Sequence, residues 1–498
     1  MKKYVISRFL RSLFSIFMVT TIAYLLIFTF VPRERIFMND QLWGKLTSRP
    51  DTQKAYEFSR YDELGYLEYE DQQSLCVRDY SNGTNDYFEC MDINSSKFAQ
   101  LKSQYESKGW VFGVYSSTNT AYASREITII QRAIKFYANM LVIDGPNKIK
   151  DASNPDLERK IYVGKDWSGK PALLCSGCEN KYLIYLNSSF PFIHQNWIKL
   201  NFGISYPTFS GIEVLTVMSD RQGEGVMRDI TFPTGVTTSS SVNEYTCEYK
   251  YTLDRLDLTK FTDKYADCRT LRKDPSMMEI SFTMGLIALF FSYLISIPLG
   301  IFMASKKNGL IDKIGMGYIV FVIAVPTLAY IYLFRFVGST VFRLPDSFPK
   351  LGAGELSSWV LPIISLSLPS VAGLLMWVRR YMVDQTTAEY VRFARSKGLS
   401  QQEIFYKHIL RNAIIPIAHG LPGSIIGAIG GAIITERIYA IPGMGKMLPD
   451  SINAYNNNVV IALTFIFTAL SILSVLLGDI LITYLDPRIH LDTKGGRN

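Results

Sequence analysis

The chain has 498 residues, of which 48% are hydrophobic and only 19% are charged, and its formal net charge is +8. Its uncharged apolar runs are longer than a soluble core helix needs, which excludes an ordinary soluble protein and indicates an integral membrane protein. Residues 32–279 carry 30 basic and 33 acidic side chains, so the positive charge lies elsewhere in the chain and does not point to nucleic acid as a partner.

Six stretches are apolar enough to cross a bilayer as helices. Each is about 20 residues long, which suits a hydrocarbon core about 30 Å thick. The first is too long for the core of a signal peptide and no small-residue cleavage site follows it, so we interpret it as a span. The predicted spans cover residues 13–31, 280–304, 314–334, 359–378, 414–435 and 459–478.

Lysine and arginine are distributed unevenly among the segments that connect these spans. With the N-terminus in the cytoplasm, the cytoplasmic segments carry 17 basic residues and the two short outer loops carry 5. Cytoplasmic loops of membrane proteins carry the basic excess, so this orientation is favoured. It predicts an N-terminus and first span over residues 1–31, an extracellular domain over 32–279, a membrane core over 280–485 and a cytoplasmic tail over 486–498.

The predicted extracellular domain contains all six cysteines of the chain. An even number on the oxidising side of a membrane indicates disulfides, although six cysteines allow 15 pairings and the sequence does not choose among them. The CSGC stretch is also compatible with zinc or redox chemistry. No second ligand pair and no strand-to-helix setting accompanies it, so we favour a structural disulfide. The disulfide candidates are Cys76, Cys90, Cys175, Cys178, Cys247 and Cys268.

The same domain is expected to mix helices and strands. Residues 127–143 have helical periodicity, whereas 181–190 and 212–218 are rich in aromatic and β-branched side chains and are expected to form strands. The run TGVTTSSSVN at 234–243 is expected to be a loop.

The cytoplasmic segment at residues 379–413 contains the basic stretch AEYVRFARSKGLSQQEIFYKHILRN. Thr386 with Glu389, and Ser400 with Glu403, have the spacing of capping boxes, and Gly398 suits the left-handed position that ends a helix. The stretch therefore predicts two short helices bent at a glycine. An amphipathic linker on anionic lipid and a docking element for a cytoplasmic partner both fit this pattern, and a DNA-binding helix-turn-helix fits less well.

The residues of this loop carry a family resemblance. EYVRFARSKGLS followed by KHILRNAIIP resembles the cytoplasmic EAA coupling loop of ABC importer permeases, in the variant of the oligopeptide and dipeptide permeases, the OppB/DppB family. Arg392 and Phe393 stand where the general motif has Glu and Ala, as in the peptide subfamily. LPIISLSLPSVAGLLMWVRRYMVD, TERIYAIPGMGKML, LDPRI and NFGISYPT resemble further segments of that family, and the large insertion is similar to the Ami-type oligopeptide permeases of Gram-positive bacteria.

The resemblance implies an α-helical membrane protein with six transmembrane helices of the MetI-like permease type and an extracellular α+β insertion between the first two. It implies as partners a second related permease, two cytoplasmic ATPases, an extracellular peptide-binding lipoprotein and the surrounding membrane lipid. ATP and magnesium are then bound by the ATPases, and this chain binds no cofactor.

The resemblance also implies roles for residues of the loop. Tyr390, Val391, Phe393 and Ala394 are expected to fill a groove on an ATPase, while basic side chains, Lys397 among them, pair with acidic groups at its rim. The implied coupling residues are Tyr390, Val391, Arg392, Phe393, Ala394, Arg395, Gly398, Leu399 and His408.

The sequence contains no catalytic motif of its own. AIPGMGKML approaches a phosphate-binding loop but has Ala440 where the first glycine belongs and Met447 where Ser or Thr must hold magnesium. The 4 histidines are scattered and form no HExxH motif. We therefore expect a permease, not an enzyme, and no metal site.

Within the spans, glycines and a few ionisable groups stand out. Gly423, Gly427 and Gly431 form two overlapping GxxxG patterns, which serve either packing within the bundle or a subunit interface or pathway. His419, Glu436 and Asp479 lie close enough to an interface to reach water, so we assign them no substrate role. Within the family, the sequence does not decide whether the cargo is an oligopeptide, a dipeptide, nickel or glutathione. The alternative to a transporter is a membrane-anchored receptor or sensor.

Overall fold

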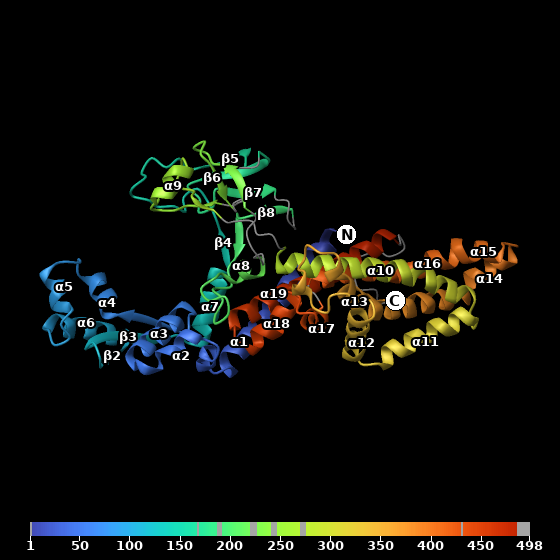
Figure 1. The fold of residues 1–498 in the computed structure, drawn as a ribbon, viewed down its shortest axis with the longest axis horizontal. Helices are drawn as coiled ribbons and strands as arrows, with labels where there is room; N and C mark the ends of the chain where they lie inside the picture. Colours follow the sequence, from blue (N-terminus) through green and yellow to red (C-terminus); the bar gives the residue numbers. More distant parts are fainter. Residues whose placement is uncertain are drawn as a thin grey trace.

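The computed structural model describes residues 2–166, 169–186, 192–219, 227–240, 247–268, 275–429 and 432–485. In Figure 1 the molecule is elongated, with a bundle of long helices on one side and an insertion that extends from the other end as two lobes. The short helices α14 and α15 lie at the end of the bundle opposite the insertion. We call these two ends the loop end and the insertion end.

The bundle consists of long apolar helices that pack in pairs. α10 packs along α13, α16 along α19, and α1 along α19. Within the described part of the chain, five helices are long and apolar enough to span a membrane, and the α11–α12 pair makes a sixth candidate if it is taken as one broken span. The bundle helices are α1 (Lys2–Phe30), α10 (Met277–Ser305), α11 (Leu310–Ala324), α12 (Thr327–Thr340), α13 (Ser357–Thr386), α16 (Leu410–Ile429) and α19 (Asn457–Leu485).

The third and fifth predicted spans differ from the expected single helices. α11 and α12 meet at an angle of 108°, so residues 314–334 are not one straight helix. The break falls at Pro326, which has no N–H to donate and fixes its own backbone angle. In the fifth, α16 ends at Ile429, and the short helices α17 (Ile433–Ile438) and α18 (Met444–Asn453) follow it.

The first lobe, residues 33–126, combines a small antiparallel sheet with short helices. Its strands are ordered β1-β3-β2. A buried cluster that includes Leu75, Phe98 and Leu101 forms its core, and the Cys76–Cys90 disulfide joins α4 to α5 within that core. The elements are α2 (Gln41–Lys45), α3 (Pro50–Glu63), β1 (Leu67–Asp71), α4 (Gln72–Asp79), α5 (Asn85–Cys90), α6 (Ser96–Glu106), β2 (Val111–Tyr115) and β3 (Thr120–Glu126).

The second lobe, drawn from residues 141–200 and 227–268, is built around a four-stranded antiparallel sheet ordered β5-β6-β7-β8. The antiparallel pair β4–β9 is the stem that joins this lobe to the rest of the chain (Figure 1). Its elements are β4 (Leu141–Ile143), β5 (Lys160–Lys165), β6 (Pro171–Ser176), β7 (Tyr182–Leu186), β8 (Ile193–Gln195), β9 (Ile198–Leu200), β10 (Arg228–Thr231), β11 (Thr237–Ser240), β12 (Cys247–Glu248), α9 (Arg255–Lys260) and β13 (Asp267–Cys268).

All six cysteines form disulfides, and two of these staple the second lobe. Cys247 and Cys268 face each other across β12 and β13 and are bonded. Cys175 is bonded to Cys178 within the CSGC stretch, and neither side chain is more than 1% exposed. The bond expected as one alternative is therefore present, and burial, which keeps these sulfurs from exchange partners, supports a structural role for it.

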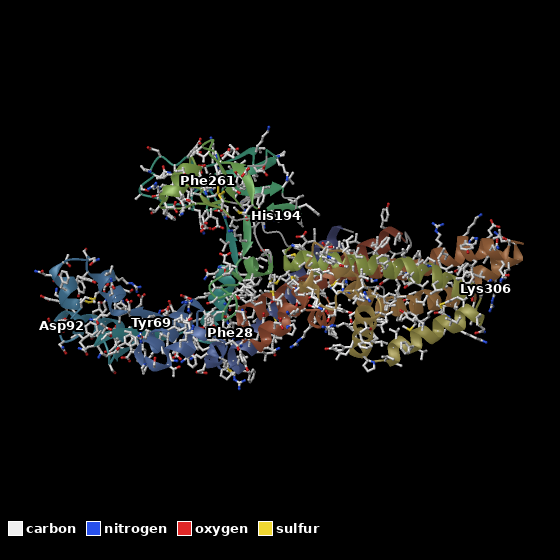
Figure 2. The ribbon with its side chains drawn as sticks, viewed as in Figure 1. Phe28, Tyr69, Asp92, His194, Phe261 and Lys306 are labelled. Atoms are coloured by element: carbon white, nitrogen blue, oxygen red, sulfur yellow. A yellow bond between two sulfur atoms is a disulfide. The ribbon has the colours of Figure 1, made fainter. Side chains whose placement is uncertain are left out.

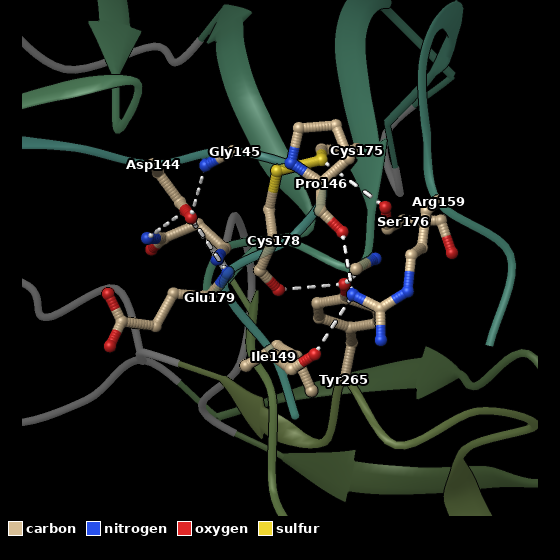
Figure 3. The surroundings of a disulfide bond; sticks show 12 residues. Asp144, Gly145, Pro146, Ile149, Arg159, Cys175, Ser176, Cys178, Glu179 and Tyr265 are labelled. Atoms are coloured by element: carbon tan, nitrogen blue, oxygen red, sulfur yellow. Dashed lines mark hydrogen bonds between the residues drawn. A yellow bond between two sulfur atoms is a disulfide. The ribbon is translucent and has the colours of Figure 1, made fainter. Parts of the chain in front are cut away.

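The CSGC turn is fixed by hydrogen bonds around it (Figure 3). The buried carboxylate of Asp144 accepts from the backbone N–H groups of Glu179, at 2.9 Å, and Asn180, at 2.8 Å. Gly177 has φ of +84°, and a Cβ there would lie 2.2 Å from the carbonyl oxygen of Pro146. The turn therefore requires glycine at this position for both conformation and space.

Three expectations for the insertion can be compared with the structure. The helix expected at 127–143 is present as α7 (Ile129–Met140). The strand expected at 212–218 is wrong, because these residues form the helix α8 (Val214–Ser219), which buries Val217 and Met218 against the bundle. A loop was expected at 234–243, but residues 237–240 form β11, which pairs with β10, so the expectation is wrong there. The last three residues of that range lie outside the described part of the chain.

The NFGISYPT segment joins the insertion to the start of α19. Asn456 donates from Nδ2 to Ser205 Oγ at 2.8 Å, and Asp40 accepts from the hydroxyls of Tyr56 and Tyr206. Burial alone raises the pKa of the Asp40 carboxyl, but these two hydroxyl donors hold it below its usual value. Residues distant in sequence are thus brought together where the insertion meets the bundle.

Candidate coupling site and transport pathway

The basic loop of residues 379–413 is folded back on the loop end of the bundle. α13 ends at Thr386, α14 (Glu389–Ser396) and α15 (Gln401–Glu403) follow, and a π-helical turn over Ile404–Ile409 leads into α16. Figure 2 shows Lys306, at the end of α10, in the same part of the molecule. π-helical turns inside helices are often found at functional sites, so this turn is a further indication that the loop is functional.

The bend between the two short helices is made by Gly398. Its φ is +80°, its N–H donates to the Arg395 carbonyl at 3.0 Å, and the N–H of Leu399 donates to the Ala394 carbonyl at 3.3 Å. These two bonds define a Schellman motif with glycine in the left-handed position. The predicted role of Gly398 in ending the helix is confirmed.

The helix starts are only partly as predicted. Ser400 Oγ accepts from the N–H of Glu403 at 3.3 Å, as expected of a helix cap. The capping box predicted at Thr386 and Glu389 is wrong. α13 continues to Thr386, whose hydroxyl donates to the Val383 carbonyl. Ala388 occupies the N-cap of α14 instead, without a side-chain cap.

The inward face of the loop packs on its own bundle. Val391 is 0% exposed and Ala394 5% exposed, and both pack with Ile404, Ile409 and residues of α10, α13 and α16. The expectation that Val391 and Ala394 fill a groove on an ATPase is therefore wrong, because neither side chain reaches the surface. Half-buried residues complete this face: Tyr390, Leu399 and His408.

The outward face of α14 is formed by Arg392, Phe393, Arg395 and Lys397. All four are exposed, Phe393 to 61%. Lys397 Nζ lies 4.4 Å from the centroid of the Phe393 ring, so the aromatic group is surrounded by positive charge. This outward face is one part of the loop that another protein can contact.

A buried ion pair fixes the base of the loop. Arg379, near the end of α13, donates from Nη2 to Asp312 Oδ2 at 2.7 Å, and its Nε donates to the other carboxylate oxygen. Asp312 also accepts from the N–H of Asn308 at 2.8 Å, and its side chain is 3% exposed. A bidentate pair of this kind sets geometry as well as attraction. Sequence reasoning missed it, since the two residues are 67 positions apart.

A substitution at Gly398 tests the bend. We expect Gly398→Val to reduce ATP-driven transport strongly, because a left-handed backbone costs roughly 1–2 kcal/mol for an ordinary residue and more for a β-branched one. Gly398→Asn should retain most activity, because asparagine tolerates this region and no atom within 4 Å would meet a Cβ. Uptake into reconstituted vesicles measures both, and equal activity of the two variants would contradict the assigned role.

A cavity of about 510 Å³ lies between α10, α13 and α16. Ser292 of α10, Ser370 and Trp377 of α13, and Gly420 and Ser424 of α16 contribute to its wall. None of the described residues that line it carries an acidic, basic or imidazole side chain. Its wall therefore offers apolar surface, hydroxyls and backbone groups to whatever enters.

Glu436 has a structural role that the sequence did not indicate. The expectation that it reaches water is wrong, because its side chain is 0% exposed. It accepts from the hydroxyl of Ser281, at 2.7 Å, and from the N–H of Lys446, at 2.7 Å. A Cβ at Gly443 would lie 2.4 Å from its carboxyl carbon. The carboxylate thus caps α18 within the IPGMG segment and ties that helix to α10.

The other singled-out groups in the spans have ordinary partners. Asp479 forms an ion pair with Arg8 and lies 3.4 Å from His419 Nε2. A Cβ at Gly423 would lie 3.7 Å from Ser474 of α19, which is normal packing distance. Gly427 lies on α16, and Gly431 lies outside the described residues.

A bundle of apolar helices, an uncharged cavity inside it and a bent basic loop at its end are features that fit a membrane permease. The chain belongs to the family described as "Binding-protein-dependent transport system inner membrane component", which matches residues 296–491. It is thus a multi-pass membrane component of an ABC transporter, as the resemblance of the loop implied.

Individual relatives match over different lengths. The chain is 44% identical over 501 residues to "Oligopeptide transport system permease protein AmiC" of Streptococcus pneumoniae, with 100% of both chains covered. It is 33% identical to "Dipeptide transport system permease protein DppB" of Lactococcus lactis, over 43% of this chain and 70% of the relative. It is 28% identical to "Oligopeptide transport system permease protein OppB" of Haemophilus influenzae, over 46% and 74%. The first match includes the insertion.

Proposed function

We propose that this chain is a permease subunit of an ABC importer that carries oligopeptides into the cell. The observation that carries this proposal is the 44% identity to an oligopeptide permease over the whole of both chains, insertion included. Partner ATPases hydrolyse ATP, and the loop of residues 379–413 transmits their movement to the helices.

The proposed assembly contains a second related permease, two cytoplasmic ATPases that bind ATP and magnesium, and an extracellular peptide-binding lipoprotein. Both termini lie in the cytoplasm and the insertion lies outside. The basic residues at the loop end support this orientation, as does the position of that loop opposite the insertion (Figure 1). The outward face of α14 provides the exposed aromatic and basic groups that a docking element needs.

The uncharged lining of the cavity between α10, α13 and α16 favours peptides over nickel as the cargo. Nickel sites in proteins use imidazole, thiolate or carboxylate ligands, and the described lining residues provide none. Peptides share a backbone but vary in side chain, so an uncharged wall with scattered hydroxyls accepts many of them. A receptor or sensor needs no such passage.

The insertion is proposed to be the platform on which the loaded lipoprotein docks. Three disulfides staple its two lobes, and α8 anchors it to the bundle through Met277 and Met444. A platform held in this way presents a fixed surface near the mouth of the pathway.

The assembly can be tested by purification in mild detergent. We expect the tagged chain to copurify with a second permease and two ATPases, and the reconstituted complex to take up labelled oligopeptides only with ATP and the lipoprotein. A homo-oligomer that transports peptides without ATPases would overturn the proposal. Uptake of dipeptide, glutathione or nickel in preference to longer peptides would overturn only the cargo.

A further inference from the structure

α7 belongs to the insertion by sequence, but it packs against the first membrane span. The Tyr137 hydroxyl lies 2.7 Å from Thr21 Oγ1, and the ring centroids of Tyr137 and Phe17 are 4.9 Å apart. The rings of Phe136 and Tyr24 are 5.0 Å apart. One side of α7 is thus bound to the face of α1.

These contacts lie deep along the span. The candidate span of α1 covers Ile6–Phe30, with Arg8 and Arg11 near its start and Arg33 just beyond its end. Phe17 lies about 20 Å along the helix from Phe30 at 1.5 Å per residue. Even at a tilt of roughly 40°, that is about 15 Å in depth, or half of a hydrocarbon core about 30 Å thick. The C-terminal half of α7 is therefore at membrane depth.

The N-terminal half of α7 is fixed at the boundary of the span. The guanidinium carbon of Arg132 lies 4.0 Å from the ring centroids of both Phe28 and Tyr66, and the residue is 7% exposed. Tyr66 accepts a hydrogen bond from Asn457 at the start of α19. Figure 2 shows Phe28 where the insertion meets the bundle. This cation–π sandwich holds the helix at the level where both spans emerge.

Part of the remaining face of α7 is apolar and uncovered by the described part of the chain, and beside it runs an exposed polar stripe of Gln131, Lys135 and Asn139. Ile130 is 67% exposed and Ile134 63%, and Ala138 continues the stripe at helical spacing. The neighbouring α1 also exposes apolar side chains: Phe17, whose ring packs on Tyr137, is 45% exposed, and Phe14 is 64% exposed. Whatever surrounds that part of α1 therefore reaches α7 as well.

We propose that α7 is immersed in the bilayer from its outer side, beside α1, with Ile130, Ile134 and Ala138 against lipid acyl chains. The insertion is then not wholly extracellular, as residues 32–279 were expected to be, but dips into the membrane between its two lobes. Which side of the membrane α7 enters from depends on the proposed orientation of the importer. The depth of the helix depends only on its contacts with α1.

Spin labels can measure this placement in the complex reconstituted in liposomes. Because all six cysteines of this chain are in disulfides, a single cysteine at Ile130, Ile134 or Ala138 provides one labelled site on it, and the partner subunits are labelled alone as a background. We expect a ratio of oxygen to nickel-chelate accessibility several-fold above that at Val163→Cys, a site 80% exposed on β5. The ratio should match that at Phe14→Cys on α1 and increase from Ile130 to Ala138.

Each other outcome overturns the proposal. High access to the nickel chelate, as at Val163, would place α7 in water. Low access to both reagents would mean that protein, such as the second permease, covers the stripe. Because the ratio is measured without transport, it separates this inference from the proposed cargo and coupling, and three independent sites guard against one variant that fails to assemble.

Discussion

Replacing Phe393 with aspartate is expected to abolish most peptide-stimulated ATP hydrolysis while the permease still inserts and folds. The ring is 61% exposed on the outward face of α14, so its removal leaves no cavity inside this chain. Aromatic side chains at the centre of interfaces contribute about 2 kcal/mol or more, which corresponds to roughly 30-fold weaker binding. ATPase copurification and ATP hydrolysis in reconstituted vesicles measure the loss.

Two controls separate contact from charge. Lys397→Gln makes the same change in net charge on the same face, and it should cost little because exposed charge pairs are worth about 0–1 kcal/mol. Phe393→Leu keeps an apolar group and should retain most binding. If Phe393→Asp leaves the ATPases bound and active, the loop is only a lipid-facing linker and its proposed role is wrong.

The loop also shows how far sequence reasoning reaches. Gly398 was predictable because only a residue that tolerates positive φ ends a helix in this way. The helical period of α14 could also have shown that Phe393 points outward. Instead, Phe393 was expected on the same apolar side of the helix as Val391 and Ala394. At about 100° per residue, Val391 and Ala394 share one face, while Phe393 lies about 200° from Val391. The helical period thus separates the buried pair from the exposed ring.

Other features depend on contacts that no local pattern records. α8 contains β-branched residues and was expected to be a strand, but Val214, Val217 and Met218 have the i, i+3, i+4 spacing of a helix face and bury it against the bundle. Tertiary packing overrides strand propensity there. Pro326 indicates from the sequence that the helix is interrupted there. The angle of 108° between α11 and α12 is not readable in the same way, because it depends on how α12 packs on α13 and α17.

Glu436→Ala is expected to abolish uptake while the ATPases remain bound. The change removes the acceptor of the Ser281 hydroxyl and of the Lys446 N–H, both inside the protein. A buried donor left without its acceptor costs about 1–3 kcal/mol, so the loss of both contacts is expected to cost about 2 kcal/mol or more. α18 packs through Met444 and Met447 on the insertion, at the end of the bundle opposite the loop.

Graded variants distinguish a capping role from simple loss of a charge. Glu436→Gln should lie between alanine and the native residue, because its amide oxygen still accepts from Ser281 but its amide nitrogen cannot accept from Lys446. Glu355→Ala, at an exposed position, should behave as the native protein does. A double-mutant cycle with Ser281→Ala should give a coupling of about 0.5–3 kcal/mol in thermal unfolding of the complex. Full uptake by Glu436→Ala, or additive effects in the cycle, would mean that this buried carboxylate does not hold α18 to α10 and that the contact between the two helices is not needed for transport.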